Sequence, residues 1–169
     1  MDKRWILIII ILIIGVSCLF FIVDSSNNIG KATSELKGYI ITIPSSMNIE
    51  TSEGGTLVLV NRNVAEKIVI EISDKGNFTD EIYDRELVKL NNREDVADIQ
   101  NTTVVIDKDK MPTLFYKDEN GTFNQISILY KYKHTFTIKS INYKDNNTLN
   151  NDAESIVESL TIDYKQKHD

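Results

Sequence analysis

The chain has 169 residues and a net charge of −6. Lys3 and Arg4 against Asp2 give the first 23 residues a charge of +1, which leaves −7 for the remaining 146. An acidic segment of this size argues against nucleic acid and against an anionic lipid surface as partners. It is long enough for one domain with its own core. The single cysteine, Cys18, lies outside the acidic segment, so the core of that segment contains no disulfide and must be stable without one.

Residues 5–23 form an uncharged apolar run, WILIIIILIIGVSCLFFIV. As a helix this run spans about 28 Å, close to the roughly 30 Å of a bilayer's hydrocarbon core. Lipid offers no partners to backbone N–H and C=O groups, so the segment must be helical despite its many isoleucines. We predict a single transmembrane signal-anchor helix over 5–23. Lys3 and Arg4 precede it and Asp24 follows, so the positive-inside rule places residues 1–4 in the cytoplasm and the C-terminal part outside the cell membrane.

Two alternatives to an uncleaved anchor stay open. A cleaved secretory signal has a shorter apolar core and a small-residue cleavage site, whereas this long core is followed by Asp24-Ser25-Ser26. Residues 15–18, Gly-Val-Ser-Cys, resemble a degenerate lipoprotein signal with Cys18 as the lipidated residue. The apolar run continues for five residues beyond Cys18, which favours an ordinary membrane-helix cysteine.

Three further regions follow the anchor. Residues 24–38 have little apolar content and are predicted to be a linker, with a short helix over Lys31–Leu36 as an alternative within it. The folded domain is expected over 39–163, and residues 164–169 form a polar tail.

The first half of the domain is predicted to contain four strands and a helix. The strands cover Tyr39–Ile43, Asn48–Thr51, Thr56–Val60 and Lys67–Ser73. Thr56–Val60 is apolar on both faces, which is typical of a central strand. A helix over Asp80–Leu90 follows, with Thr79 as its N-cap and with Tyr83, Leu87 and Leu90 on one face. Residues 93–101 are ambiguous between a loop and a last helical turn.

The second half is predicted to contain four strands in hairpin succession and a C-terminal helix. The strands cover Thr102–Ile106, Met111–Tyr116, Phe123–Lys133 and Thr135–Tyr143, and His134 lies in the turn between the last two. The helix has Asn151 as its N-cap and Glu154 three residues on, which nearly completes a capping box. Its apolar stripe consists of Ala153, Ile156, Val157 and Leu160.

This order of elements indicates an α+β fold with a mainly antiparallel sheet. The Tyr-Ile-Ile-Thr-Ile-Pro opening at 39–44, the early hairpin, the mid-chain helix and the closing Ala-Glu-Ser-Ile-Val-Glu-Ser-Leu at 153–160 resemble the PsbP-like family. The resemblance covers roughly 38–162 and implies an α/β/α sandwich with a non-catalytic binding or assembly role. The chain resembles a membrane-anchored prokaryotic member of the family, and a photosystem role is not carried over. The resemblance assigns no functional residue to this chain.

The sequence offers no convergent reactive set, so we expect no catalytic, cofactor-binding or metal-binding residue. The two histidines lie in a predicted turn (His134) and in the polar tail (His168), and the acidic part contains neither a thiol nor a G-x-S-x-G motif. The carboxylates gather in three groups, for which a solvated acidic face is favoured over a glycosidase pair or a calcium site. These groups are Asp80, Glu81, Asp84 and Glu86; Glu94, Asp95 and Asp98; and Asp107 and Asp109.

Two sets of polar side chains are candidates for modification or contact. Four glycosylation sequons begin at Asn77, Asn101, Asn120 and Asn146, at predicted turns or element edges. Four tyrosines of the late strands are candidates for an exposed aromatic contact surface, with half-buried sheet packing as the alternative. These are Tyr116, Tyr130, Tyr132 and Tyr143.

The function expected from the sequence is that of a membrane-anchored extracytoplasmic module that binds or organises a neighbour without catalysis. Its partners would be membrane lipid, through the N-terminal helix, and another envelope protein. One alternative is a hydrolase of envelope polymers with two carboxylates about 5–10 Å apart in a cleft. Another alternative is a sensor of a small ligand or calcium. In that case, adding the ligand would raise the thermal stability of the domain.

Overall fold

The computed structural model describes residues 33–61, 63–143 and 150–162. The chain divides into two compact units, Met1–Lys31 and Ala32–Asp169, and every described residue belongs to the second unit. The predicted anchor over 5–23, the tail 164–169 and the sequon at Asn146 lie outside the described residues. Within the described residues, no helix combines the length and the apolar character that crossing a bilayer requires.

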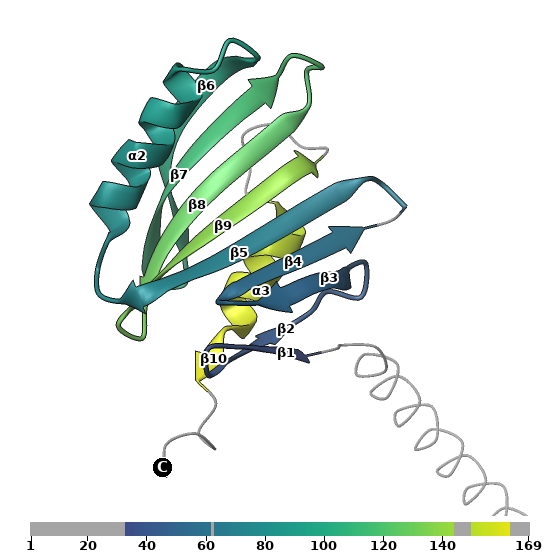
Figure 1. The fold of residues 1–169 in the computed structure, drawn as a ribbon, viewed down its shortest axis with the longest axis vertical. Helices are drawn as coiled ribbons and strands as arrows, with labels where there is room; N and C mark the ends of the chain where they lie inside the picture. Colours follow the sequence, from purple (N-terminus) through teal and green to yellow (C-terminus); the bar gives the residue numbers. More distant parts are fainter. Residues whose placement is uncertain (1–32, 62, 144–149, 163–169) are drawn as a thin grey trace, which may run out of the picture. The chain divides into compact units, whose positions relative to one another are not determined.

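A seven-stranded antiparallel sheet forms the centre of the domain, in the order β3-β4-β5-β9-β8-β7-β6 (Figure 1). The N-terminal meander β3–β5 and the later meander β6–β9 join where β5 pairs with β9. This arrangement confirms the predicted α+β class with a mainly antiparallel sheet. The strands are β3 (Asn48–Glu53), β4 (Thr56–Asn61), β5 (Glu66–Lys75), β6 (Val96–Ile106), β7 (Asp109–Asp118), β8 (Phe123–Lys131) and β9 (His134–Tyr143).

A second, three-stranded sheet has the order β1-β2-β10. Its strands are β1 (Thr33–Leu36), β2 (Tyr39–Thr42) and β10 (Thr161–Ile162). The β1–β2 turn is Lys37-Gly38, whose φ angles of 48° and 80° suit a two-residue hairpin. The alternative of a helix over Lys31–Leu36 is therefore wrong for its described part, and the predicted linker extends too far. Pairing with β2 supplies the backbone partners of β1, which a local sequence pattern does not reveal.

Two helices, α2 (Thr79–Asn91) and α3 (Asn151–Ser159), lie on opposite faces of the large sheet (Figure 1). Leu90 of α2 packs against Leu114 and Ile126, whereas Ile156 and Val157 of α3 belong to the larger core on the other face. The larger core also takes in β2, β4, β5 and β9. The result is the helix–sheet–helix layering that the resemblance implies.

The strand β4 shows how the two faces of the sheet differ. Leu57 and Leu59 are fully buried against the larger core, while the alternating Val58 and Val60 are only half-buried. The prediction of a central strand is confirmed only in part, because β4 has a neighbour on each side but lies one strand from the edge of the sheet. However, only one of its two apolar faces is fully covered.

The structure corrects both predicted helix N-caps. The N-cap of α2 is Phe78, which makes no side-chain capping bond, and Thr79 is the first helical residue. The Oδ1 of Asn77 accepts from the Thr79 N–H at 3.2 Å and from its hydroxyl at 2.7 Å. In α3 the N-cap is Asn150, whose Oδ1 accepts from the N–H groups of Asp152 and Ala153. For α3 two neighbouring asparagines can cap the helix, whereas α2 begins without a side-chain cap, so the usual preference for threonine placed its N-cap one residue too late.

Two strand boundaries also differ from the predictions. His134 is the first residue of β9, where it pairs with Lys131, and the turn consists of Tyr132-Lys133. The ambiguous segment 93–101 enters β6 from Val96 onward. There a bulge between Ala97 and Gln100 interrupts the ladder, which obscures the alternation of apolar and polar residues.

Candidate functional site

The acidic side chain buried most deeply in the domain is Glu86, with 8% of its side chain exposed. Its Oε1 accepts from Lys89 at 2.7 Å, and its Oε2 lies 3.7 Å from the Nζ of Lys139. Burial alone would raise the pKa of Glu86. The hydrogen bond from Lys89 and the charges of Lys139, Lys89 and Arg85 outweigh burial and place that pKa below its ordinary value. Glu86 is therefore an ionised structural carboxylate that joins α2 to the sheet.

Lys139 lies between two carboxylates, because its Nζ is also 3.1 Å from Glu71 of β5. Glu71 and Glu86 are thus two carboxylates that share one lysine, and a glycosidase would use two carboxylates facing a cleft. The lowered pKa of Glu86 favours its ionised form, whereas a general acid must hold a proton. The Glu71–Lys139–Glu86 group therefore links β5, β9 and α2 through ion pairs.

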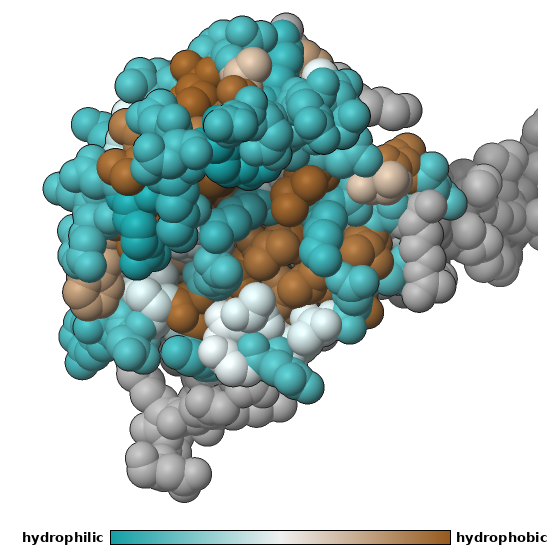
Figure 2. All heavy atoms as spheres, turned by 45° about the horizontal axis from the view of Figure 1, so that its top comes forward, coloured by the Kyte–Doolittle hydropathy of each residue, from teal (hydrophilic) through white to brown (hydrophobic). Residues whose placement is uncertain are grey.

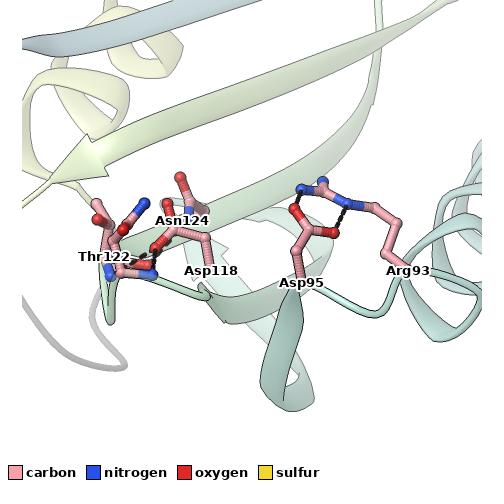
Figure 3. A network of polar contacts seen from close by, with 6 residues as sticks. Arg93, Asp95, Asp118, Thr122 and Asn124 are labelled. Carbon is pink, nitrogen blue, oxygen red and sulfur yellow. Dashed lines mark hydrogen bonds and ion pairs between the residues drawn. The ribbon is translucent and has the colours of Figure 1, made fainter.

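Several other predicted acids are held in ion pairs on the surface. Asp95 accepts from Arg93 at 2.9 and 2.5 Å (Figure 3), Asp98 from Lys117 at 2.8 Å, and Asp109 lies 2.9 Å from Lys131. In contrast, Asp80, Glu81, Asp84 and Asp107 have no such partner among the described residues.

No metal site is formed within the described ranges, since they contain no group of three or more potential ligands. The acidic turn after β7 has a structural role instead. The Oδ1 of Asp118 accepts from the N–H of Asn120 at 3.0 Å and from that of Thr122 at 2.9 Å, and the Asn124 amide donates to the Thr122 carbonyl (Figure 3). These bonds close the β7–β8 hairpin.

His134 has the contacts of a packed side chain. Its Nδ1 lies 3.0 Å from the carbonyl oxygen of Ser73, and its ring packs edge-on against Tyr39 with centroids 5.5 Å apart. Among the described side chains, His134 has no hydrogen bond to a hydroxyl or thiol nucleophile, since its polar contact is to a backbone carbonyl. The second histidine, His168, lies outside the described residues.

The four predicted tyrosines do not form one surface. Tyr116 is half-buried near α2, and Tyr143 is only 6% exposed. Tyr130 and Tyr132 are about two-fifths exposed, at 42% and 39%. Tyr132 stacks on Tyr39 of the small sheet. The alternative of sheet packing describes Tyr116, Tyr132 and Tyr143 better than an aromatic contact surface does.

Three of the predicted sequon asparagines are described, and all three are exposed. Asn77 lies in the loop before α2, Asn101 lies on the edge strand β6, and Asn120 lies in the β7–β8 turn. The exposure of these three asparagines is compatible with glycosylation, which stays a prediction.

The main surface feature that sequence reasoning missed is an uncovered part of the sheet, on the same face as α2. The helix packs against β6, β7 and β8, which leaves the α2-side face of β4, β5 and the end of β9 open. We call this surface the open face and define it by Val58, Val60, Val69 and Ile141. Ile141 is 38% exposed and the valines are half-buried. Figure 2 shows apolar side chains gathered in a band bordered by hydrophilic ones.

The open face has a polar border. Lys139 and Glu71 lie on the side of α2. Lys67 of β5 lies within the open face, between Val60 and Ile141 in the strand register, and it donates to Glu50 of β3 at 3.0 Å. These charged groups are paired within the domain, so the open face carries no unbalanced charge. An apolar centre within a polar rim is the usual composition of a protein–protein contact surface.

Comparison with known proteins shows the fold of the domain. No protein-family model matches the chain, and no curated protein matches it. Among solved structures it is similar to the solution structure of cyanobacterial PsbP from Synechocystis sp. PCC 6803, with a TM-score of 0.52 and 14% identity, over 79% of this chain and 94% of that one. A crystal structure from Bacteroides thetaiotaomicron VPI-5482 gives a TM-score of 0.52 and 18% identity, over 79% of this chain.

This chain spans only 48% of the Bacteroides protein's length. At such identities the similarity concerns the fold and carries no activity or partner to this chain. The likeness to cyanobacterial PsbP agrees with the antiparallel sheet and the two helices described above. The domain therefore has a PsbP-like fold.

Proposed function

We propose that this chain is a membrane-anchored prokaryotic protein whose PsbP-like domain binds a neighbouring envelope protein outside the cell membrane, without catalysing a reaction. The apolar run over 5–23 and its flanking charges support the anchor and its orientation. The observation that carries the binding role is the open face, on which four aliphatic side chains remain partly exposed. Contiguous apolar patches on soluble domains commonly mark contact sites.

The partner that suits the open face is a folded protein with an apolar patch of its own. The floor of Val58, Val60, Val69 and Ile141 offers dispersion and desolvation but no unpaired polar group to recognise a small polar ligand. The bordering charges are already paired, so they would contribute to specificity more than to affinity. A hydrolase receives less support, because Glu71 and Glu86 both form ion pairs with Lys139 and face no described cleft as a pair.

Photocrosslinking tests the binding role. In the full chain expressed in its own membranes, a photoreactive amino acid at position 69 should form a discrete adduct, because Val69 lies within the open face. The control is position 88 on the outer side of α2, where Val88 is 57% exposed and should yield no such adduct. A Val58→Lys substitution should abolish the adduct formed at position 69, since it places a charge in the apolar floor. Equal adducts at both positions, or an adduct that survives Val58→Lys, would contradict the proposal.

Cysteine labelling tests the location independently. Glu119 lies exposed in the β7–β8 turn, and Cys18 is the chain's only native cysteine. In intact cells, a maleimide that cannot cross membranes should label the full-length Glu119→Cys variant and leave the parent chain unlabelled, since Cys18 would be within lipid. Labelling of Glu119→Cys only after lysis would place the domain on the inner side and remove the proposed orientation.

A further inference from the structure

The two edges of the large sheet differ in how well they are protected. The edge strand β3 is short, carries Glu50 and Glu53, and has a bulge between Ile49 and Thr51. At the other edge, β6 runs for 11 residues and, within the described part of the chain, pairs with β7 alone (Figure 1). Proteins usually protect such edges with lysine, proline or bulges. From Ile99 to Ile106, IQNTTVVI, there is no charge and no proline, and the bulge lies before Gln100.

The register of β6 fixes which backbone groups face outward. Thr103 pairs with Pro112, which has no N–H, and the hairpin closes through the two-residue turn Asp107-Lys108. Both facts make Thr103–Pro112 a pair whose residues exchange no hydrogen bonds. Alternate residues of β6, namely Asn101, Thr103 and Val105, therefore direct their N–H and C=O groups to the open edge. A further strand would find a regular row of donors and acceptors there.

A depression lies beside this edge, between β6 and the first turns of α2. Its volume is about 340 Å³, and it is lined by Asp80 and Tyr83 of α2, residues 101–103 of β6, and Pro112 of β7. Asn101 and Thr103 pair with Leu114 and Pro112, and Leu114 packs on α2, so this side of β6 faces the helix. Alternate side chains of an added strand would point toward the same depression, which is how strand-addition sites obtain specificity.

The negative charge beside the depression favours a basic segment as its ligand. Asp80 is exposed, its carboxylate has no ion pair or hydrogen bond with any described residue, and no described residue lining the depression is basic. Asp84 lies one helical turn further on and is also exposed. Lysine or arginine on an added strand would meet this negative charge. A second copy of β6, paired antiparallel about Thr103, would instead bring the Asp80 residues of both copies to one seam, where they repel each other.

We propose that β6 is a strand-addition site for an extended basic segment of a partner protein, which pairs along Gln100–Ile106 and places a lysine or arginine beside Asp80. This site is separate from the open face, and it does not depend on what binds there. Glycosylation at Asn101 would block it, because Asn101 lines the depression.

Peptide binding to the full-length protein in uncharged detergent tests the proposal. The probe is a short fluorescein-labelled peptide in which lysine alternates with valine or threonine, and its counterpart carries glutamate in place of lysine. The lysine peptide should bind, the glutamate peptide should not, and Asp80→Asn should weaken binding about tenfold, the effect of losing roughly one charged contact. The matched variant Asp84→Asn, outside the depression, should bind like the parent.

A backbone variant separates strand addition from simple charge attraction. Thr103→Pro removes an outward N–H while leaving the β6–β7 ladder intact, since edge positions of this kind tolerate proline. It should lose most of the binding, and the bound lysine peptide should slow amide exchange at Asn101, Thr103 and Val105 in the parent. Equal binding by Thr103→Pro and the parent, or equal losses in Asp80→Asn and Asp84→Asn, would overturn the proposal. So would a dimer in sedimentation that Thr103→Pro dissociates, because it would make the second copy the occupant.

Discussion

Replacing Phe136 by alanine is expected to lower the free energy of unfolding by about 3–5 kcal/mol, the usual cost of deleting a buried aromatic ring. Phe136 of β9 is 1% exposed, and its ring packs edge-on against Tyr39 with centroids 5.3 Å apart. The Tyr39 hydroxyl donates to the carbonyl of Tyr132 at 3.1 Å, so this ring cluster joins β2 to the large sheet. Urea unfolding of the compact unit from Ala32 onward measures the loss.

The same variant should loosen the small sheet more than the rest of the domain. Amide exchange in β2 should accelerate beyond what the global loss of stability explains, because Tyr39 loses a packing partner. The control is Val88→Ala, which shortens a side chain that is 57% exposed and should change stability by less than about 0.5 kcal/mol. A Phe136→Ala protein as stable as the Val88→Ala protein would show that the ring cluster does not hold the two sheets together.

The second large effect is expected at Glu86. At neutral pH, Glu86→Gln should cost about 1.5–3 kcal/mol, because the charged hydrogen bond from Lys89 is lost and Lys139 keeps only Glu71 as a counter-charge. The surface variant Glu119→Gln provides the control, since that side chain is exposed and forms no bond with a described residue. Equal unfolding midpoints for the two variants would exclude a stabilising role for Glu86.

The cost of Glu86→Gln should depend on pH. The pKa of Glu86 lies below its ordinary value of 4.5 in the folded state, so its ionised form contributes stability that is fully present above that value. As the pH falls below 4.5 and through the lowered pKa, the carboxylate takes up a proton and that contribution disappears. The difference in unfolding free energy between parent and Glu86→Gln should therefore shrink in this acid range. A difference that stays constant from neutral to acid pH would contradict the assignment.

The fold was predictable wherever a local pattern matched a single element. The alternation in Lys67–Ser73 and the stripe of Ala153, Ile156 and Val157 predict β5 and α3, and the structure confirms both. The β1 strand was not predictable, because Thr33–Leu36 becomes a strand only by pairing with β2. In physical terms, local periodicity reports which faces are buried, while pairing partners depend on the whole topology.

The candidate surfaces were harder to predict than the fold. Val58 and Val60 look like core residues in the sequence, and only the position of α2 over β6–β8 leaves them partly exposed. The uncharged run in β6 is visible in the sequence, yet its significance depends on β6 being an edge strand. The roles of the acids were obscured for the same reason, because Glu86 and Lys139 are separated in the sequence and meet only in the folded domain.

The three-stranded sheet places the domain's first and last strands on either side of β2, since β1 and β10 both pair with it. A growing polypeptide therefore cannot complete this sheet until residues 161–162 have been synthesised. The apolar residues of α3, which seal the larger core, also emerge late. We infer that the domain reaches its native state only after α3 and residues 161–162 have left the ribosome, so a truncated product ending before α3 would remain open to proteolysis.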